Sequence, residues 1–336
     1  MRKPGLDLCR VIACMGVVLI HTLMLFWDFD PASPTWIFYN LAALAMRLSV
    51  PLFFMISGAL LLGRERLDFN RHLRRLLHFV LLFYLWSLIC HGIDRLLLHV
   101  WNEGDFLIAL LSGYYHLWYL PALALCYSAL PLLHGLIHGE AENTKKGALL
   151  LAGVVAVRLT LALIPGKSAW LSALLASWKL SDFTYLVYFL LGWLLSRVRL
   201  PKRALWLLGL AALAAVLVLA HLNRRYSIGT GRASDLYYGY LTPSAALSAA
   251  LVFCLCLRAE RIPPRLGGVL KTLSDCTFGV YLTHPVFIDA LRSLHLDFTQ
   301  YNTLLFLPLC YVSLLLLPLA ATWLLRRIPL LKKLVS

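Results

Sequence analysis

Apolar stretches follow one another along almost the whole chain, separated by short polar segments. Each stretch is about 18–25 residues long, the length that an α-helix needs to cross the hydrocarbon core of a bilayer. Only 14% of the residues are charged, compared with about 25% in soluble globular domains. Because lipid offers no hydrogen-bond partners, a spanning segment must satisfy its backbone internally, as a helix does. The sequence therefore predicts an all-α polytopic membrane protein with a single transmembrane domain over residues 1–336.

Ten transmembrane helices are expected. The first is predicted to be retained rather than cleaved, because Asp7 and Arg10 interrupt the apolar run that a signal peptide would need. The ninth is short and interrupted by Gly279 and Pro285. The expected spans are 6–27, 37–62, 77–100, 113–137, 147–164, 183–199, 203–221, 239–258, 273–291 and 302–325.

Lysine and arginine concentrate in alternate polar segments. Residues 63–75 hold five arginines and residues 196–203 hold four basic residues, whereas residues 28–34 and 102–106 hold none. The side richer in basic residues is the cytoplasmic one. Both termini are therefore expected in the cytoplasm.

The net charge of +15 does not indicate a nucleic-acid partner. The basic residues form short clusters between apolar blocks, and no basic groove is interleaved with exposed aromatic residues, which nucleic acid binding requires. One segment departs from the alternation of charge, and it is either a solvated loop or a contact to an anionic lipid phosphate. Its basic residues are Arg224, Arg225 and Arg232.

Ionisable groups inside apolar spans are costly, so they usually face the interior of a helix bundle and mark a functional path. Arg10 and His21 are eleven positions apart in the first span, which places them on one helix face about 16 Å apart along the axis. Asp7, Cys14 and Val17 belong to the same stripe. Histidine has the pKa suited to a general base near neutral pH. His21 is thus either such a base or a histidine that hydrogen-bonds between helices.

The roles of several other polar residues are left open by the sequence. Arg71, Arg74 and Arg75 at the start of the third span either anchor the cytoplasmic side or clamp phosphate, whose oxygens suit arginine forks. Ser57-Gly58 either permits close helix packing or lines a channel. Arg158 in the fifth span needs a partner, and the candidates are Asp94, Asp182 or a lipid phosphate.

The eight cysteines lie mostly inside apolar blocks and form no CxxC pair or Cys/His metal spacing. Small buried apolar side chains are the expected role. No metal site is predicted.

Four stretches occur together in this chain: Arg10-x10-His21, RLSVPLFFMISGALLLG (47–63), RHLRRLLHF (71–79) and TFGVYLTHPVF (277–287). With these stretches the chain resembles the membrane acyltransferase-3 family of inner-membrane O-acyltransferases. The likeness runs over the whole chain, and ten spans match the family core. Two further stretches, SPTWIFYN (33–40) and YYHLWYLPALALCYSALPLL (114–133), look closest to the branch that acetylates enterobacterial common antigen.

The resemblance implies an O-acetyltransferase of the bacterial inner membrane. It would move an acetyl group from cytoplasmic acetyl-CoA to a sugar hydroxyl of a lipid-linked or surface glycan, such as N-acetylglucosamine residues of enterobacterial common antigen. Acetyl-CoA is then a substrate rather than a resident cofactor, and the partners are the acyl-CoA, the glycan and membrane lipids.

The resemblance also implies roles for individual residues. His21 would be the general base, and Arg47 or Arg10 would stabilise the oxyanion. Acylation of His21 itself is a two-step variant. Arg71, Arg74 and Arg75 would hold the CoA phosphates. Supporting donor positions are Ser57, Tyr281 and His284, and a weaker acceptor group, otherwise an aromatic belt at the membrane surface, is His116, Trp118 and Tyr119.

Three alternatives remain at this point. A succinyl or other acyl donor would keep the chemistry and add a carboxylate that needs a cation, which Arg47 would supply. A transporter or lipid-glycan flippase would also place polar groups and a broken span at membrane depth. A non-catalytic acyl sensor would keep its function without His21.

Overall fold

The computed structural model describes residues 3–26, 33–98, 106–146, 184–259, 263–294 and 302–335, together with positions 30, 148–149, 152–153, 169–170 and 172. Every regular element in these ranges is a helix, so the all-α prediction is confirmed for them. Most of the expected fifth span lies outside the described residues, as do Arg158, Asp182 and most of segments 28–34 and 102–106, which hold no basic residues. The chain divides into two compact units.

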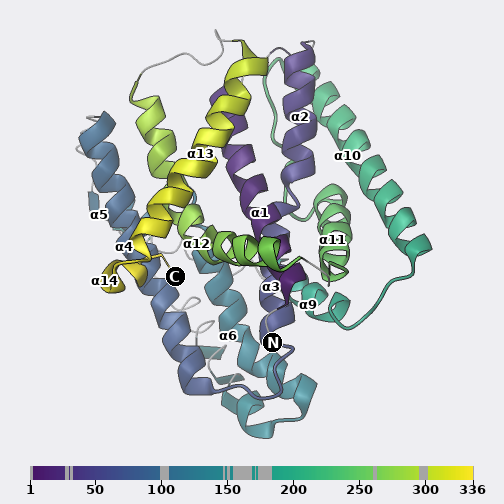
Figure 1. Cartoon of the computed structure of the whole chain (residues 1–336), viewed down its shortest axis with the longest axis vertical. Helices are drawn as coiled ribbons and strands as arrows, with labels where there is room; N and C mark the ends of the chain where they lie inside the picture. The colour runs from purple at the N-terminus through teal and green to yellow at the C-terminus, as the bar shows by residue number, and fades with distance from the viewer. Residues whose placement is uncertain are drawn as a thin grey trace. The chain divides into compact units, whose positions relative to one another are not determined.

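The first unit contains residues 1–56 and 194–336. Its first helix, α1, packs against α2, α11, α12 and α13, and α10 packs against α2 and α11 (Figure 1). The unit is thus built around α1. Its elements are α1 (Pro4–Leu23), the 3-10 turn η1 (Met24–Phe26), α2 (Pro34–Met46), α10 (Lys202–Thr230), α11 (Pro243–Leu257), α12 (Pro264–Arg292), α13 (Thr303–Leu325) and α14 (Pro329–Lys332).

The second unit contains residues 57–193. It holds α4 (Phe69–Leu98), α5 (Phe106–Ser112) and α6 (Tyr119–His138), with α4 packed against both others. Two more helices, α3 (Ser49–Leu61) and α9 (Thr184–Leu195), begin in one unit and end in the other.

Gly58 explains how α3 and α9 meet in the second unit. A Cβ at this position would lie 1.7 Å from the carbonyl oxygen of Phe189. No side chain fits there without moving backbone, so Gly58 permits close helix packing, as one of the two interpretations of Ser57-Gly58 predicted.

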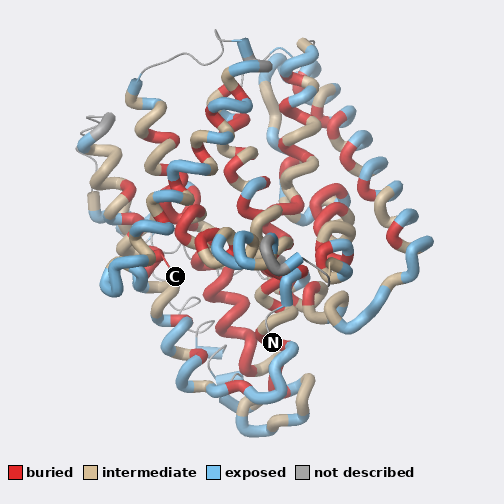
Figure 2. Tube along the Cα trace, in the orientation of Figure 1, coloured by how far each residue is buried: buried red, intermediate tan, exposed pale blue. Residues whose placement is uncertain are grey.

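Six helical segments in the described parts of the chain are long and apolar enough to cross a membrane. Their outward faces support this assignment, because α10 exposes Trp206 by 75% and Leu207 by 67%, apolar surface that a soluble monomer would rarely leave uncovered. Figure 2 shows the exposed side of α10 along its length. Ten spans and the cytoplasmic position of the termini stay predictions. The six segments are Pro4–Phe26, Pro34–Leu61, Phe69–Leu96, Tyr119–His138, Lys202–Thr230 and Leu305–Leu325.

The break in a helix falls at a different place from the one expected. The ninth span was predicted to be interrupted at Gly279 and Pro285, but α12 runs through both without a break and is 29 residues long. Instead, the apolar segment 34–61 is divided into α2 and α3 by a turn at Arg47 and Leu48. The charged side chain of Arg47 thus lies at a turn within an apolar segment. Non-helical backbone at membrane depth must be surrounded by protein or water, because lipid cannot satisfy its hydrogen bonds.

The segment between α10 and α11 is also shorter than expected. The seventh span was predicted to end at residue 221, but α10 continues to Thr230 and carries Arg224 and Arg225 on its last turns, so these two are helical rather than in a loop. A helix of 15 residues such as α11 is about 22 Å long, less than the roughly 30 Å of the hydrocarbon core.

Residues 231–242, which connect α10 to the short helix α11, fold into the first unit. A polar network fixes them there: Tyr238 donates to Asn40 Oδ1 at 2.8 Å, and Asn223 donates to the same oxygen and to Ser234 O, each at 3.0 Å. Asn40 in turn donates to Ala220 O at 2.8 Å. Tyr238 is buried. This network holds the connection against α2 and α10.

Candidate functional site

Three side chains of α1 spaced seven residues apart face α12. Asp7 accepts a hydrogen bond from Ser274 Oγ at 2.8 Å, Cys14 Sγ lies 3.9 Å from Thr277 O, and His21 Nδ1 lies 2.9 Å from His284 Nε2. Seven residues are nearly two full helical turns, so three members of the predicted stripe, Asp7, Cys14 and His21, lie in one interface with α12. The order of the contacts shows that α1 and α12 run parallel.

The histidine pair at the end of this interface has a defined proton arrangement. His284 is completely buried, and its Nδ1 lies 3.0 Å from the carbonyl oxygen of Val280. A carbonyl only accepts, so His284 Nδ1 carries the proton and its Nε2 is an acceptor when the ring is neutral. His21 Nδ1–H therefore donates to His284 Nε2. The lone pair of neutral His21 then resides on Nε2, and the imidazole is oriented by its other nitrogen, as in bases whose tautomer is fixed by a hydrogen bond.

Pro285 contributes to this arrangement. A proline has no N–H, so at this position it leaves the carbonyl of Tyr281 without its helical donor. The His284 side chain interacts with that carbonyl in addition to the one of Val280. The proline within α12 thus leaves one carbonyl, that of Tyr281, available to the histidine beside it.

Arg47 lies near His21, with which it interacts electrostatically. The guanidinium donates to Tyr240 Oη at 3.2 Å and lies 5.4 Å and 5.1 Å from the ring centroids of Tyr238 and Tyr240. Cation–π contacts stabilise the guanidinium without neutralising it. Its Nε is buried and has no hydrogen-bond partner, and no carboxylate among the described residues forms an ion pair with it. Among the described residues, no carboxylate thus compensates the positive charge of Arg47, which acts on His21.

Burial also affects the pKa of the neighbouring Tyr238. This residue lies outside the spanning helices, but its side chain is buried in the protein. Desolvation raises its pKa, and the nearby Arg47 acts in the opposite direction. Tyr238 is therefore a neutral ring at physiological pH, and it acts on Arg47 through its π face rather than through a phenolate.

A second arginine at this site was not recognised from the sequence. Arg292, at the end of α12, also interacts electrostatically with His21, and it pairs with Asp289 at 3.3 Å. The expected ninth span ended at residue 291, one residue before it. An arginine eight residues after His284 on an unbroken helix was the signal that could have found it. Tyr240 was missed too, since nothing in its local sequence indicates that the segment folds inward.

Arg10 lies elsewhere. It pairs with Asp7 at 3.0 Å, and eleven residues of helix separate it from His21 by about 16 Å. Asp7 is only 3% exposed, so Arg10 compensates a buried carboxylate at the opposite end of the α1–α12 interface. Of the two arginines that the sequence analysis considered for an oxyanion, Arg47 is the one beside His21.

Tyr281 is half-buried one turn of α12 before His284, with its ring 6.1 Å from that of Phe278. It belongs to the same unit as the histidine pair. Ser57, another supporting donor position, begins the second unit next to Gly58.

The predicted arginine cluster lies on the second unit, at the start of α4. Arg71, Arg74 and Arg75 are all exposed. Arg64 in the preceding segment interacts electrostatically with this cluster. Burial lowers the pKa of its guanidinium, and the charge of Arg75 lowers it further. Asp68 accepts a hydrogen bond from the backbone N–H of Arg71 at 3.0 Å, which caps the helix. That N–H holds the pKa of Asp68 below its usual range, and Arg71 adds to the effect.

The aromatic group at residues 114–119 is partly buried. His116 is 3% exposed and contacts the rings of both Tyr114 and Tyr115, at centroid distances of 5.7 Å and 5.6 Å. Trp118 lies 5.5 Å from Tyr185. Tyr119 begins α6. The exposed ring in this segment is Tyr115, which the sequence analysis did not single out.

Two observations concern metals and cysteines. All eight cysteines are free and buried, which confirms their expected role as small buried side chains. Over the described residues, no group of three histidine, cysteine or carboxylate side chains is suited to hold a metal ion.

Comparison with known proteins gives one family and one curated relative. A family model described as an acyltransferase domain, of the acyltransferase-3 type, matches residues 3–325. An Enterococcus faecalis protein named amino-acid racemase is 27% identical over 321 residues, which are 87% of this chain and 42% of that protein. The chain therefore spans less than half of that relative's length. No solved structure matches the chain.

Proposed function

The chain belongs to the acyltransferase-3 family of membrane acyltransferases, and from this premise we propose that it is an O-acetyltransferase with His21 as its general base. The acyl donor is acetyl-CoA, and the acceptor is a sugar hydroxyl of a lipid-linked or surface glycan. The observation that carries the proposal is the hydrogen-bonded series from His21 through His284 to Val280 O. It leaves the lone pair of His21 on Nε2, as a base requires.

The chemical step is a direct transfer. His21 Nε2 takes the proton of the sugar hydroxyl as its oxygen attacks the thioester carbonyl, and the C–O bond forms. Arg47, whose charge is neutralised by no carboxylate in the described part of the chain, stabilises the negative charge that develops on the carbonyl oxygen. The C–S bond then breaks, and the imidazolium returns the proton to the thiolate of CoA. Charge and protons balance without a covalent intermediate on the enzyme.

The donor phosphates are assigned to Arg71, Arg74 and Arg75. Three exposed guanidinium groups on one helix start suit phosphate oxygens, which arginine binds with two parallel hydrogen bonds. Arg64 adds charge nearby. Tyr281 and Ser57 are kept as supporting donor contacts, and His116, Trp118 and Tyr119 as acceptor contacts. His284 acts through His21 as a positioning residue.

Acetyl ranks ahead of succinyl as the transferred group. A succinyl carboxylate needs a cation besides the one that stabilises the oxyanion, and the second arginine near His21 is already paired with Asp289. The inner membrane and an acceptor such as N-acetylglucosamine of enterobacterial common antigen are part of the proposal, supported by the sequence resemblance. The family assignment favours acyl transfer over a transporter or flippase.

The proposal is tested with purified protein in nanodiscs, radiolabelled acetyl-CoA and a lipid-linked N-acetylglucosamine glycan, in the absence of any ion gradient. Labelled glycan supports the proposal. Labelled glycan formed from radiolabelled succinyl-CoA but not from acetyl-CoA would show that succinyl-CoA is the donor. Failure to consume any acyl-CoA, with glycans of several compositions present, would contradict it.

Replacing His284 separates positioning from chemistry. His284→Phe removes the acceptor for His21 Nδ1–H, so we expect kcat to fall by about 10- to 100-fold, the range seen when a partner that orients a functional histidine is lost. His284→Gln, whose amide oxygen can accept the same hydrogen bond, should recover part of kcat. The measurements are kcat, the KM for the donor and the pH profile of kcat.

A purely structural role for His284 predicts a different result. Both variants would then lower the amount of folded protein, and the pH profile of the remaining activity would match that of the wild type. Thermal melting in detergent gives the folded fraction for each variant.

Removing the negative charge beside the arginine cluster should strengthen donor binding. Asn also caps helices, so Asp68→Asn keeps the start of α4 while it removes the carboxylate that interacts with Arg71 and Arg74. We expect the KM for acetyl-CoA to fall by about two- to five-fold, the scale of an exposed charge pair, with kcat unchanged. The effect should shrink at high salt.

The pH dependence of this effect follows from the lowered pKa of Asp68. The carboxylate is charged throughout the neutral range, so wild type and Asp68→Asn should differ there, and they should converge as the pH falls through the pKa of Asp68. Glu142→Gln is the matched control, because Glu142 is an exposed carboxylate of the same unit that pairs with Lys146 instead. An equal effect from both variants would contradict the assignment of the arginines.

A further inference from the structure

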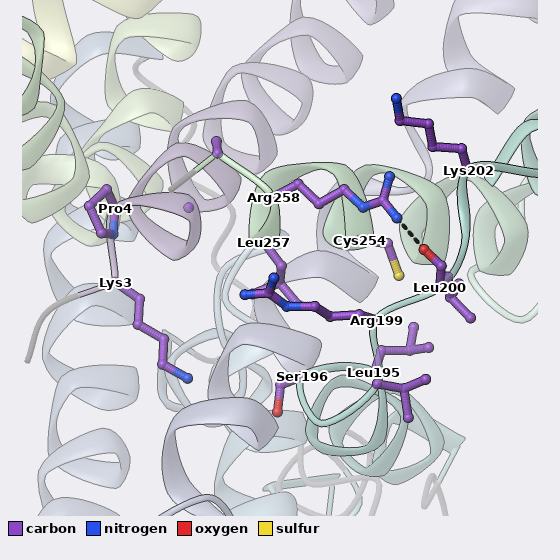
Figure 3. Close-up of a pocket in the computed structure, with 13 residues that line it drawn as sticks. Lys3, Pro4, Leu195, Ser196, Arg199, Leu200, Lys202, Cys254, Leu257 and Arg258 are labelled. Atoms are coloured by element: carbon purple, nitrogen blue, oxygen red, sulfur yellow. Dashed lines mark hydrogen bonds between the residues drawn. The ribbon is translucent and has the colours of Figure 1, made fainter. Parts of the chain in front are cut away.

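A cavity of about 650 Å³ opens beside the first residue of α1. Its lining comes from the start of the chain, from the connection between α9 and α10, and from the end of α11 (Figure 3). The volume lies within the range of pockets that bind small molecules. All of its lining residues belong to the first unit.

Four cations from these three segments line the cavity: Lys3, Arg199, Lys202 and Arg258. Among its described lining residues none is acidic. Figure 3 shows Lys3 and Lys202 on opposite sides, with Arg199 extending between them. Arg258 donates to Leu200 O, which ties the end of α11 to the connection. Such a concentration of one charge sign in a concave site attracts an anion.

Two helices begin at the same cavity. α1 starts at Pro4 and α10 at Lys202, and neither start has a side-chain cap. The first backbone N–H groups of a helix need outside acceptors and carry a partial positive charge. At the start of α1, Pro4 has no N–H and those of Leu6 and Asp7 donate to Lys3 O. An anion in the cavity would therefore interact chiefly with the start of α10 in addition to the four side chains.

The remaining lining is mostly apolar. Leu195, Leu200 and Leu257 are half-buried, and Cys254 is buried. A simple ion would leave this surface uncovered, whereas a ligand with an anionic group and an apolar part would cover both kinds of lining. The planar forks of two arginines favour phosphate over a simple halide.

We propose that this cavity binds the phosphate group of an amphiphilic phosphate ester. Two sources share this chemistry: a soluble nucleotide-type ester, and the headgroup of an anionic membrane lipid. The site is distinct from the histidine pair, because Gly5 at the cavity and His21 are 16 residues apart on α1, or about 24 Å. None of its lining residues belongs to the arginine cluster Arg71, Arg74 and Arg75, so the proposal stands whether or not the proposed acyl transfer is correct.

The test measures binding without turnover. Protein is placed in nanodiscs of phosphatidylcholine and titrated with radiolabelled adenosine 3′,5′-bisphosphate. A second arm counts phosphatidylglycerol molecules retained by native mass spectrometry after purification from mixed lipid. The test variant is the double substitution Arg199→Met and Lys202→Met, which keeps long side chains and removes two charges.

The control removes the same charge outside the cavity. Arg203 follows Lys202 on the first turn of α10 and Lys332 lies in α14, both exposed and neither lining the cavity. The control is therefore the double substitution Arg203→Met and Lys332→Met. We expect at least a tenfold loss of affinity, or loss of the retained lipid, in the test variant and less than a twofold change in the control.

Each outcome decides the proposal. Selective loss of bisphosphate binding supports a soluble ligand, and selective loss of phosphatidylglycerol supports a lipid headgroup. Absence of both ligands from wild type, or equal loss in test and control variants, overturns the site. If the double variant fails to fold, Lys3→Met replaces it, since Lys3 precedes α1 and is exposed.

Discussion

His21→Ala is expected to lower kcat by about 10²- to 10⁴-fold, the contribution typical of a positioned general base. The loss arises because no other group in the series from His21 to Val280 O can present a lone pair where His21 Nε2 does. The KM for acetyl-CoA should change little, since the donor phosphates are assigned to the second unit. The measurement is transfer of label from acetyl-CoA to the glycan.

His221→Gln is the matched control. His221 is an exposed histidine of α10 in the same unit, and its replacement should leave kcat within a factor of two. Wild-type activity in His21→Ala, with folding verified by melting, would remove His21 from the mechanism and favour the acyl-sensor interpretation.

Arg47→Met should lower kcat by about 10²- to 10³-fold, the effect of removing one group that stabilises an oxyanion. Arg47→Lys keeps a charge but loses the planar fork that reaches Tyr240 and stacks on Tyr238, so it should recover only part of the activity. The measurements are kcat and the KM for both substrates.

Arg10 provides the contrast that identifies the role of Arg47. Arg10→Met would leave the carboxylate of Asp7 buried without its cation, which destabilises proteins by about 3–5 kcal/mol. Its expected effect is thus a lower melting temperature, with kcat of the folded fraction changed far less than in Arg47→Met. A larger loss of kcat from Arg10→Met than from Arg47→Met would reverse the assignment.

Apolar length predicted the helices well where packing did not alter them. α13 covers residues 303–325 against an expected 302–325, because an uninterrupted apolar run leaves the backbone no alternative to a helix. The break at Arg47 was not predictable in this way. It depends on Tyr238 and Tyr240, which fold back from a segment almost two hundred residues away.

For the candidate site, the sequence predicted individual residues but not how they contact one another. An ionisable group in an apolar span identified His21, and the resemblance identified His284, but nothing local indicates that their rings form a pair. That pairing depends on the parallel packing of α1 and α12. Arg292 was missed because Pro285 suggested an interrupted helix, whereas its missing N–H instead supplies an acceptor to His284.

The parallel contact between α1 and α12 also bears on how a bulky acceptor reaches the base. The contact is fastened at both ends, by Asp7 with Ser274 and by His21 with His284. Separating the two helices would break the hydrogen bond that orients the base. For the proposed transfer we therefore expect this seam to stay closed, with the lipid-linked acceptor entering the first unit by a route that leaves α1 and α12 together.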